Sequence, residues 1–188
     1  MPEQVDYSQA IDSGHPYFEL FKDKLAQLPT IFAVPETACS AEPDTAFPLK
    51  LFCYQEGKVN VFKYFFSFES DFASYESVCS DFELQKKFDP NIDEFRKQME
   101  TPGGDAQLIY LSYKKVLIMS SRDFEYVRLT FRKGKEWWVL CTSDPSREEI
   151  KGKVRGEMIL TATRVVEREG RIEVSVSSQT DMKIPIKL

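Results

Sequence analysis

The sequence predicts an α+β domain built on a strongly curved antiparallel β-sheet. Helical and β-rich segments follow one another in blocks: a helix, a hairpin, one or two further helices, and then a run of antiparallel strands. Fifteen Phe, eight Tyr and two Trp supply apolar side chains for a core and for the lining of a cavity. A curved sheet wrapped around helices can leave such a cavity. The 188 residues suit one domain, with or without a small extension.

Two segments carry apolar residues at helical spacing. In residues 14–28 these residues fall on one face, and Pro29 ends the helix. Residues 71–82 have a similar stripe. The two stripes consist of Phe18, Phe21, Leu25 and Leu28, and of Phe72, Tyr75, Val78, Cys79 and Phe82. Residues 29–48 contain four prolines and are expected to form a loop.

The rest of the chain is β-rich. Residues 49–54 and 59–68 form an expected hairpin around a turn that contains Gly57. Residues 91–100 are compatible with a polar helix or with an edge strand, and Pro102-Gly103-Gly104 predicts a turn after them. The later expected strands are residues 106–113, 123–132, 136–142, 154–166 and 171–180.

Charge and cysteine content narrow the class of protein. A net charge of −5 argues against a general nucleic-acid binder. The four cysteines form no CxxC pair, so they are either two disulfides of a secreted protein or reduced thiols of a cytosolic one. The first ten residues lack the pattern of a secretory signal, which favours a cytoplasmic protein. No apolar run reaches the roughly 18 residues of a membrane span.

Motifs for catalysis are missing. The only histidine is His15, and the sequence has no GxSxG, GxGxxG, P-loop or HExxH motif. Without a base near Ser or Cys, nucleophilic catalysis is disfavoured. No clustered Cys and His ligands indicate zinc. We therefore expect no enzyme, no cofactor and no metal, although a carboxylate pair among the thirty acidic residues stays open.

One segment between two expected strands combines basic and apolar residues. Lys114 and Lys115 are followed by Val116, Leu117, Ile118 and Met119. The apolar cluster is either the start of a buried strand or an exposed loop that enters a membrane surface. In the second case the two lysines would meet anionic headgroups.

Arg128 lies in an aromatic strand. At period two it shares a face with Phe124, Tyr126 and Thr130. Its guanidinium either reaches solvent along the sheet or is buried. A buried guanidinium needs an acidic partner or a ligand oxygen, because an unpaired interior charge costs several kcal/mol, roughly.

Four short motifs resemble the START family of lipid-transfer domains. Arg122-Asp123-Phe124-Glu125-Tyr126-Val127-Arg128 resembles its RDF-x-x-V-R strand, and Gly152-Lys153-Val154-Arg155-Gly156 resembles its G-x-[VI]-R-[GA] strand start. Lys87-Phe88-Asp89-Pro90-Asn91-Ile92 and Asp181-Met182-Lys183-Ile184-Pro185 resemble two further family segments. The motifs follow family order and spacing over about residues 45–188, which we expect to be the START-like domain. Residues 1–44 would be part of that domain or an extension to it.

The resemblance implies a helix-grip fold, in which a curved antiparallel sheet and helices enclose a hydrophobic tunnel. The chain ends at Leu188, before the position of the family's last helix, so that C-terminal helix is expected to be absent from this chain. Arg128 matches an inward arginine of sterol-binding members, whose acidic partner is replaced here by Ser112. We hypothesise that Asp89 pairs with Arg128 instead. The expected lipid-binding residues are Arg128, Asp89, Tyr110, Ser112, Phe124, Tyr126 and Thr130.

The resemblance further implies binding of one lipid, a sterol or a phospholipid, and its transfer between membranes. The expected partners are that lipid and, transiently, a membrane surface touched by residues 114–119; nucleic acid is not expected. Two alternatives stay open: a lipid-sensing regulatory module, and an acid–base enzyme or hydrolase of the same superfamily. The sequence makes no prediction of oligomeric state.

Overall fold

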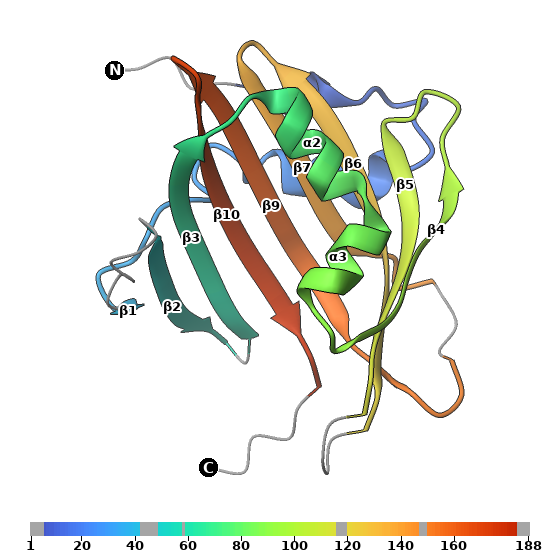
Figure 1. Ribbon diagram of the computed structural model, residues 1–188. Coiled ribbons are helices and arrows are strands. Elements are labelled where there is room, and N and C mark those ends of the chain that lie inside the picture. The colour runs from blue at the N-terminus through green and yellow to red at the C-terminus, as the bar shows by residue number, and fades with distance from the viewer. Residues whose placement is uncertain (1–5, 42–48, 58, 116–119, 147–149, 184–188) are drawn as a thin grey trace.

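A single large antiparallel sheet forms the body of the molecule (Figure 1). The computed structural model describes residues 6–41, 49–57, 59–115, 120–146 and 150–183. The strands lie in the order β1-β2-β3-β10-β9-β7-β6-β5-β4, and the short β8 pairs in parallel with β6. Their bounds are β1 Cys39–Ala41, β2 Lys50–Glu56, β3 Val59–Glu69, β4 Ile92–Glu100, β5 Ala106–Tyr113, β6 Arg122–Lys133, β7 Glu136–Ser143, β8 Val154–Arg155, β9 Glu157–Arg168 and β10 Arg171–Asp181.

Helices lie on both faces of this sheet. Figure 1 shows α2 (Phe72–Ser80) and α3 (Phe82–Phe88) in front of the strands and the N-terminal segment behind them. That segment contains a 3₁₀ turn, η1 (Ser8–Ala10), and the helix α1 (Phe18–Leu25). The α+β architecture with a large antiparallel sheet confirms the predicted fold class.

Two aspartates divide the second predicted helix. Asp71 accepts a hydrogen bond from the backbone N–H of Ser74 and begins α2. Asp81 has an extended backbone and accepts from the N–H of Leu84, so α2 ends and α3 begins there. Asp is a strong N-cap residue because its carboxylate satisfies free backbone donors of the first turn. The prediction of one helix over residues 71–82 was therefore wrong at its C-terminal end.

Three strand predictions are resolved or corrected. Residues 92–100 form the edge strand β4, which confirms one of the two alternatives. Part of the expected loop pairs with β2 as the short strand β1. The expected strand 154–166 is divided at Gly156 into β8 and β9. A Cβ atom at Gly156 would lie 2.3 Å from the ring of Phe124, so the backbone passes closer to that ring than any other residue allows.

The two faces of the sheet carry different parts of the core. The α1 face includes Leu108, Val127, Leu129, Trp138 and Leu140, which form one buried cluster with Phe21 and Leu25 of α1. Tyr7 and Ile11 belong to the same cluster, so the described N-terminal residues pack into the core. The opposite α2–α3 face includes Tyr126, Trp137, Val139 and Cys141, with Phe72, Tyr75 and Cys79 of α2 packed against it. Among the described helices, none is long and apolar enough to cross a membrane.

Candidate functional site

A pocket of about 220 Å³ lies between the α2–α3 helix pair and the sheet. Four strands supply its floor, since alternate residues of β4, β6, β7 and β9 point to the α2–α3 face. The helices supply its roof. The lining residues are Tyr75, Cys79, Gln85, Phe95, Tyr126, Arg128, Trp137, Val139, Cys141 and Thr163.

Arg128 is the one charged residue in this lining. It is 7% exposed, and its Nη1 donates to the backbone carbonyl of Cys79 at 3.3 Å. Four residues further along the same face of β6, Arg132 forms an ion pair with Glu76 at 3.0 Å. Two arginines of one strand therefore hold α2 against the sheet, and the inner one does so through a carbonyl.

The neighbouring titratable groups stay neutral at pH 7. Burial raises the pKa of Tyr75 and of Tyr126, and nearby Arg128 only partly opposes this effect. Burial also raises the pKa of the Cys79 thiol and raises that of Cys141 to about 11. A single cation thus faces a pocket wall with no negative charge.

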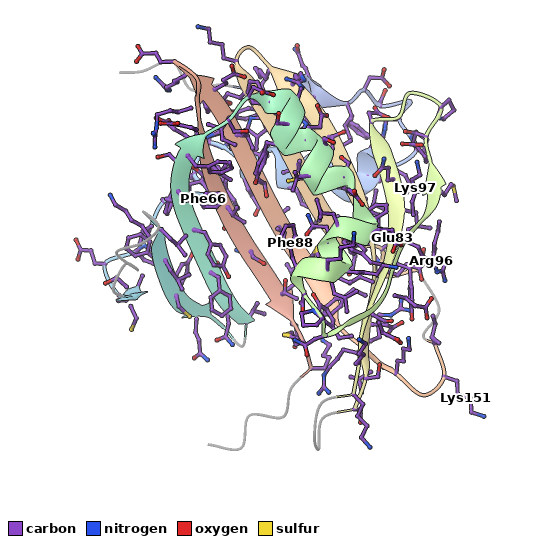
Figure 2. All side chains as sticks on the ribbon, in the orientation of Figure 1. Phe66, Glu83, Phe88, Arg96, Lys97 and Lys151 are labelled. Atoms are coloured by element: carbon purple, nitrogen blue, oxygen red, sulfur yellow. The ribbon has the colours of Figure 1, made fainter. Side chains whose placement is uncertain are left out.

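An aromatic row extends the apolar surface beyond the pocket. β3 and β10 pair in register, so the even-numbered residues of β3 lie on the α2–α3 face beside Val174 and Val176. The row consists of Phe62, Tyr64, Phe66 and Phe68, all partly exposed. The first two rings stack on each other, as do the last two. Figure 2 marks Phe66 on β3 and Phe88 on α3, both on this side of the sheet.

Among the larger hollows, two lie between the N-terminal segment and the sheet, away from this face. One of about 590 Å³ separates residues 27–37 from β2 and β3, and its lining includes Gln27, Glu56, Lys63 and Gln179. Another of about 390 Å³ lies between α1 and the start of β9, with Lys24, Glu125 and Arg155 among its lining. Both linings carry several polar and charged groups, whereas the α2–α3 pocket is lined mainly by aromatic and cysteine side chains, with Arg128 as its one charged residue. Apolar ligands favour the second kind of wall. The described residues contain no group of three side chains suited to a metal ion.

Comparison with solved structures gives the fold a name. Human STARD10 superimposes with a TM-score of 0.72 over 95% of this chain and 72% of its own, at 14% identity. Human StAR-related lipid transfer protein 5 gives a TM-score of 0.66 over 87% and 80%, at 15% identity. A STAR-related lipid transfer protein fragment from Xanthomonas axonopodis gives 0.61 over 78% and 82%, at 17% identity. The fold is that of a START domain. Neither family sequence models nor curated protein sequences match the chain.

The START fold places part of the predicted site together. Phe124, Tyr126, Arg128 and Thr130 alternate along β6 toward the α2–α3 face, and Tyr126 and Arg128 line the pocket. The Phe124 ring packs against Tyr113 at 6.2 Å between centroids. Thr130 is directed to the backbone instead, because its hydroxyl donates to the carbonyl of Asp105 at 3.2 Å.

Tyr110 and Ser112 lie on the other face of the sheet. They alternate with Ile109 and Leu111, which belong to the α2–α3 face. On the α1 side, Lys153 Nζ donates to the Tyr110 hydroxyl at 3.2 Å and to Ser112 Oγ at 2.9 Å. Tyr110 and Ser112 therefore do not lie beside Arg128, since the strand register places Gln107 and not Ser112 opposite Arg128, and their contact with a ligand stays a prediction.

Asp89 is also separate from Arg128. It follows α3, and its Oδ1 accepts from the backbone N–H of Asn91 at 3.0 Å. The described residues include no ion pair between Asp89 and Arg128, which contradicts the hypothesised pairing. The local turn that starts β4 occupies this carboxylate instead.

The predicted membrane loop is only partly described. Lys114 and Lys115 are exposed, and Lys114 Nζ donates to the carbonyl of Pro90 at 2.8 Å. Val116, Leu117, Ile118 and Met119 lie outside the described residues. Phe88, two residues before Pro90 at the end of α3, is 70% exposed.

The sequence reasoning missed most of the pocket wall. Tyr75 and Cys79 were recognised only as members of a helical stripe, and Val139 and Cys141 only as parts of a strand. The spacing of these residues predicted which of them share a face of the same helix or strand. It did not predict which faces of separate strands meet beneath α2.

Proposed function

We propose that this chain binds one lipid molecule on the α2–α3 face and transfers it between membranes. The observation that carries the proposal is the pocket itself: mainly aromatic walls, with two cysteines and Val139, around one buried cation, Arg128. Each CH₂ group removed from water contributes about 0.8 kcal/mol, so such a surface offsets much of the low solubility of a lipid monomer. Two solved structures with the same fold, which are named as lipid transfer proteins, support the proposal.

The proposal requires the helix pair to move. A volume of about 220 Å³ is below the roughly 300–1,000 Å³ of typical ligand sites. Neither α2 nor α3 contains a fully buried residue, and weakly packed elements open at low free-energy cost. Displacement of α2 would join the pocket to the aromatic row of β3, which gives an acyl chain or a sterol ring system a longer apolar surface. Opening at a bilayer would keep that surface out of water.

Exchange would take place at a membrane surface beside the end of α3. Lys114 and Lys115 would meet anionic headgroups, residues 116–119 would enter the interface, and exposed Phe88 would insert beside them. Phe124 and Tyr126 would contact the ligand from β6. No step needs bonds to be made or broken, so we propose a cytoplasmic carrier and not an enzyme.

Native mass spectrometry of the protein purified from cells, followed by lipid extraction, tests binding directly. We expect one lipid per chain. Transfer of a fluorescent lipid between two vesicle populations tests the carrier role. Tight binding without transfer would indicate a sensor module, and conversion of the lipid would indicate an enzyme.

Two variants locate the site. Thr163→Trp fills the pocket from β9 and should abolish lipid retention. Thr30→Trp alters the 590 Å³ hollow on the α1 face and should leave retention unchanged. The reverse pattern would refute the assignment of lipid to the α2–α3 face.

A further inference from the structure

Arg128 is a buried cation without a carboxylate partner among the residues that the structure describes. Its guanidinium has five N–H donors, and one of them reaches the Cys79 carbonyl at 3.3 Å. Arg155 provides a contrast, because its Nη2 lies 2.8 Å from Asp123. Arg128 therefore retains most of its donors and its full charge for a group that enters the pocket.

The walls around Arg128 cannot neutralise it. Tyr75 and Cys79 of α2, with Tyr126 and Cys141 of the sheet, are all neutral at pH 7 because burial raises the pKa of each. The remaining polar groups of the lining are the side chains of Gln85 and Thr163 and the indole N–H of Trp137, and none of them is charged at pH 7. A buried cation left unpaired costs several kcal/mol, roughly. An anionic ligand would remove this cost, whereas an alcohol would remove only part of it.

Charge selects the kind of anion. A guanidinium carries one positive charge, and its planar fork can bind two oxygens of either a carboxylate or a phosphate, so shape alone does not distinguish them. A phosphate group has more oxygens and up to two charges, and the described pocket lining offers one cation within about 220 Å³. We propose that the pocket binds a long-chain carboxylic acid, with its carboxylate on Arg128. This inference rests on the proposed lipid-binding function and names the class of lipid.

The Cys79 carbonyl gives this assignment a structural consequence. The carboxylate and the last turn of α2 would use the same guanidinium, so the ligand would replace the bond from Arg128 to Cys79. α2 would then remain attached through Arg132 and Glu76, which lie one helical turn away. Binding of the acid would therefore be coupled to release of the C-terminal end of α2 from Arg128.

Displacement of the neutral probe N-phenyl-1-naphthylamine from the whole chain tests the inference. Oleate and oleyl alcohol have the same chain and differ in charge. We expect oleate to displace the probe at an about tenfold lower concentration than oleyl alcohol. In Arg128→Met this ratio should fall to about one, while Arg132→Met, changed on the same face of the same strand, should keep the wild-type ratio.

Each other outcome has a defined meaning. Equal displacement by oleate and the alcohol in the wild-type chain, or an unchanged ratio in Arg128→Met, would overturn the carboxylate assignment and leave lipid binding intact. Stronger displacement by phosphatidic acid than by oleate would also overturn it. If neither the probe nor any lipid bound, the proposed function itself would fail. The wild-type comparison decides the question even if Arg128→Met does not fold.

Discussion

Asp123 and Arg155 form an ion pair of 2.8 Å across the parallel contact between β6 and β8, and the Asp123 side chain is fully buried. Both residues belong to motifs by which the sequence resembles the START family. Arg155 also lies 3.7 Å from Glu125. The pair thus joins two motifs that are about thirty residues apart in the chain, and it does so on the α1 side of the sheet, away from the proposed ligand.

Removal of the buried carboxylate should destabilise the fold. Asp123→Ala leaves Arg155 without its closest partner, so we expect the free energy of unfolding to fall by about 3–5 kcal/mol. Urea denaturation followed by circular dichroism measures this change. Glu94→Ala removes a half-exposed carboxylate 3.6 Å from Lys153 and should cost less than about 1 kcal/mol. Equal effects would mean that the buried pair has no special role.

Only glycine fits at position 156, because the Phe124 ring lies directly against the backbone there. A Cβ atom there would lie 2.3 Å from the Phe124 ring, which is 3% exposed and has little room to move. Gly156→Ala should lower the free energy of unfolding by about 1–3 kcal/mol. Gly103→Ala is the control, since the nearest atom to its Cβ would be the Asp105 carboxylate at 3.4 Å.

A second substitution can separate crowding from backbone effects. Phe124→Leu shortens the side chain in front of residue 156. If crowding is the cause, Gly156→Ala should cost less in the Phe124→Leu background than in the wild-type chain. A constant cost in both backgrounds would point to the backbone of residue 156 instead.

Periodicity predicted the faces within each strand, but not the alignment between strands. The residues Phe124, Tyr126 and Arg128 do share a face, as alternation along one strand requires. Ser112 was misplaced because its position depended on the register between β5 and β6. A shift of one residue in register moves every side chain to the opposite face, and the pattern of one strand determines the register only together with the partner strand and the turn between them.

For the helices, too, the sequence pattern predicted the local structure but not the tertiary arrangement. The apolar stripe of residues 72–82 predicted that this segment is helical and amphipathic. The break at Asp81 depends on one side-chain hydrogen bond to Leu84, which competes with continuation of the helix. The pocket wall depends on how α2 and α3 cross four strands. That arrangement comes from tertiary packing, so Gln85 and Thr163 were not recognised as neighbours.

The Tyr7 hydroxyl makes stability sensitive to alkaline pH. It donates to Glu136 at 2.9 Å, and burial together with this bond raises its pKa from 10.0 to about 12. Between these values the unfolded chain ionises at Tyr7 and the folded chain does not. The contribution is therefore complete below pH 10 and is lost as the pH rises through about 12.

Tyr7→Phe tests this dependence. At pH 7 the variant should be less stable by about 1 kcal/mol, because the buried hydrogen bond is lost. The difference from the wild-type chain should shrink between pH 10 and pH 12, since Phe cannot ionise. The other tyrosines are present in both proteins and cancel in the comparison. A difference that stays constant with pH would contradict the raised pKa of Tyr7.

The four thiols should react at very different rates. Cys39 is exposed, whereas burial raises the pKa of Cys141 to about 11. A thiol of that pKa is only about 0.1% thiolate at pH 8, and the thiolate is the reactive form. Pulse labelling with iodoacetamide and peptide mass spectrometry should show Cys39 modified first and Cys141 last. Labelling in urea should remove the difference, and rapid modification of Cys141 in the folded chain would contradict the raised pKa of its thiol.

Phe88 provides the sharpest test of membrane contact. Its ring is 70% exposed beside Pro90, whose carbonyl accepts from Lys114. Insertion of a Phe ring contributes about 1.5–3 kcal/mol, so Phe88→Ser should weaken binding to vesicles of phosphatidylcholine and phosphatidylserine at least about tenfold. Lys114→Glu should weaken it about five- to tenfold at low salt, and much less with phosphatidylcholine alone.

Lys97→Glu is the matched control for charge. Lys97 is exposed in the second half of β4 and is marked in Figure 2, whereas Pro90 precedes the start of that strand. Its reversal changes net charge by the same amount as Lys114→Glu, so an equal loss of vesicle binding would indicate a general charge effect and not a defined surface. Co-sedimentation measures binding. Because none of the three changes touches the pocket, probe binding in solution should be unaffected, and a loss there would show that the variant disturbs the fold and not the membrane contact.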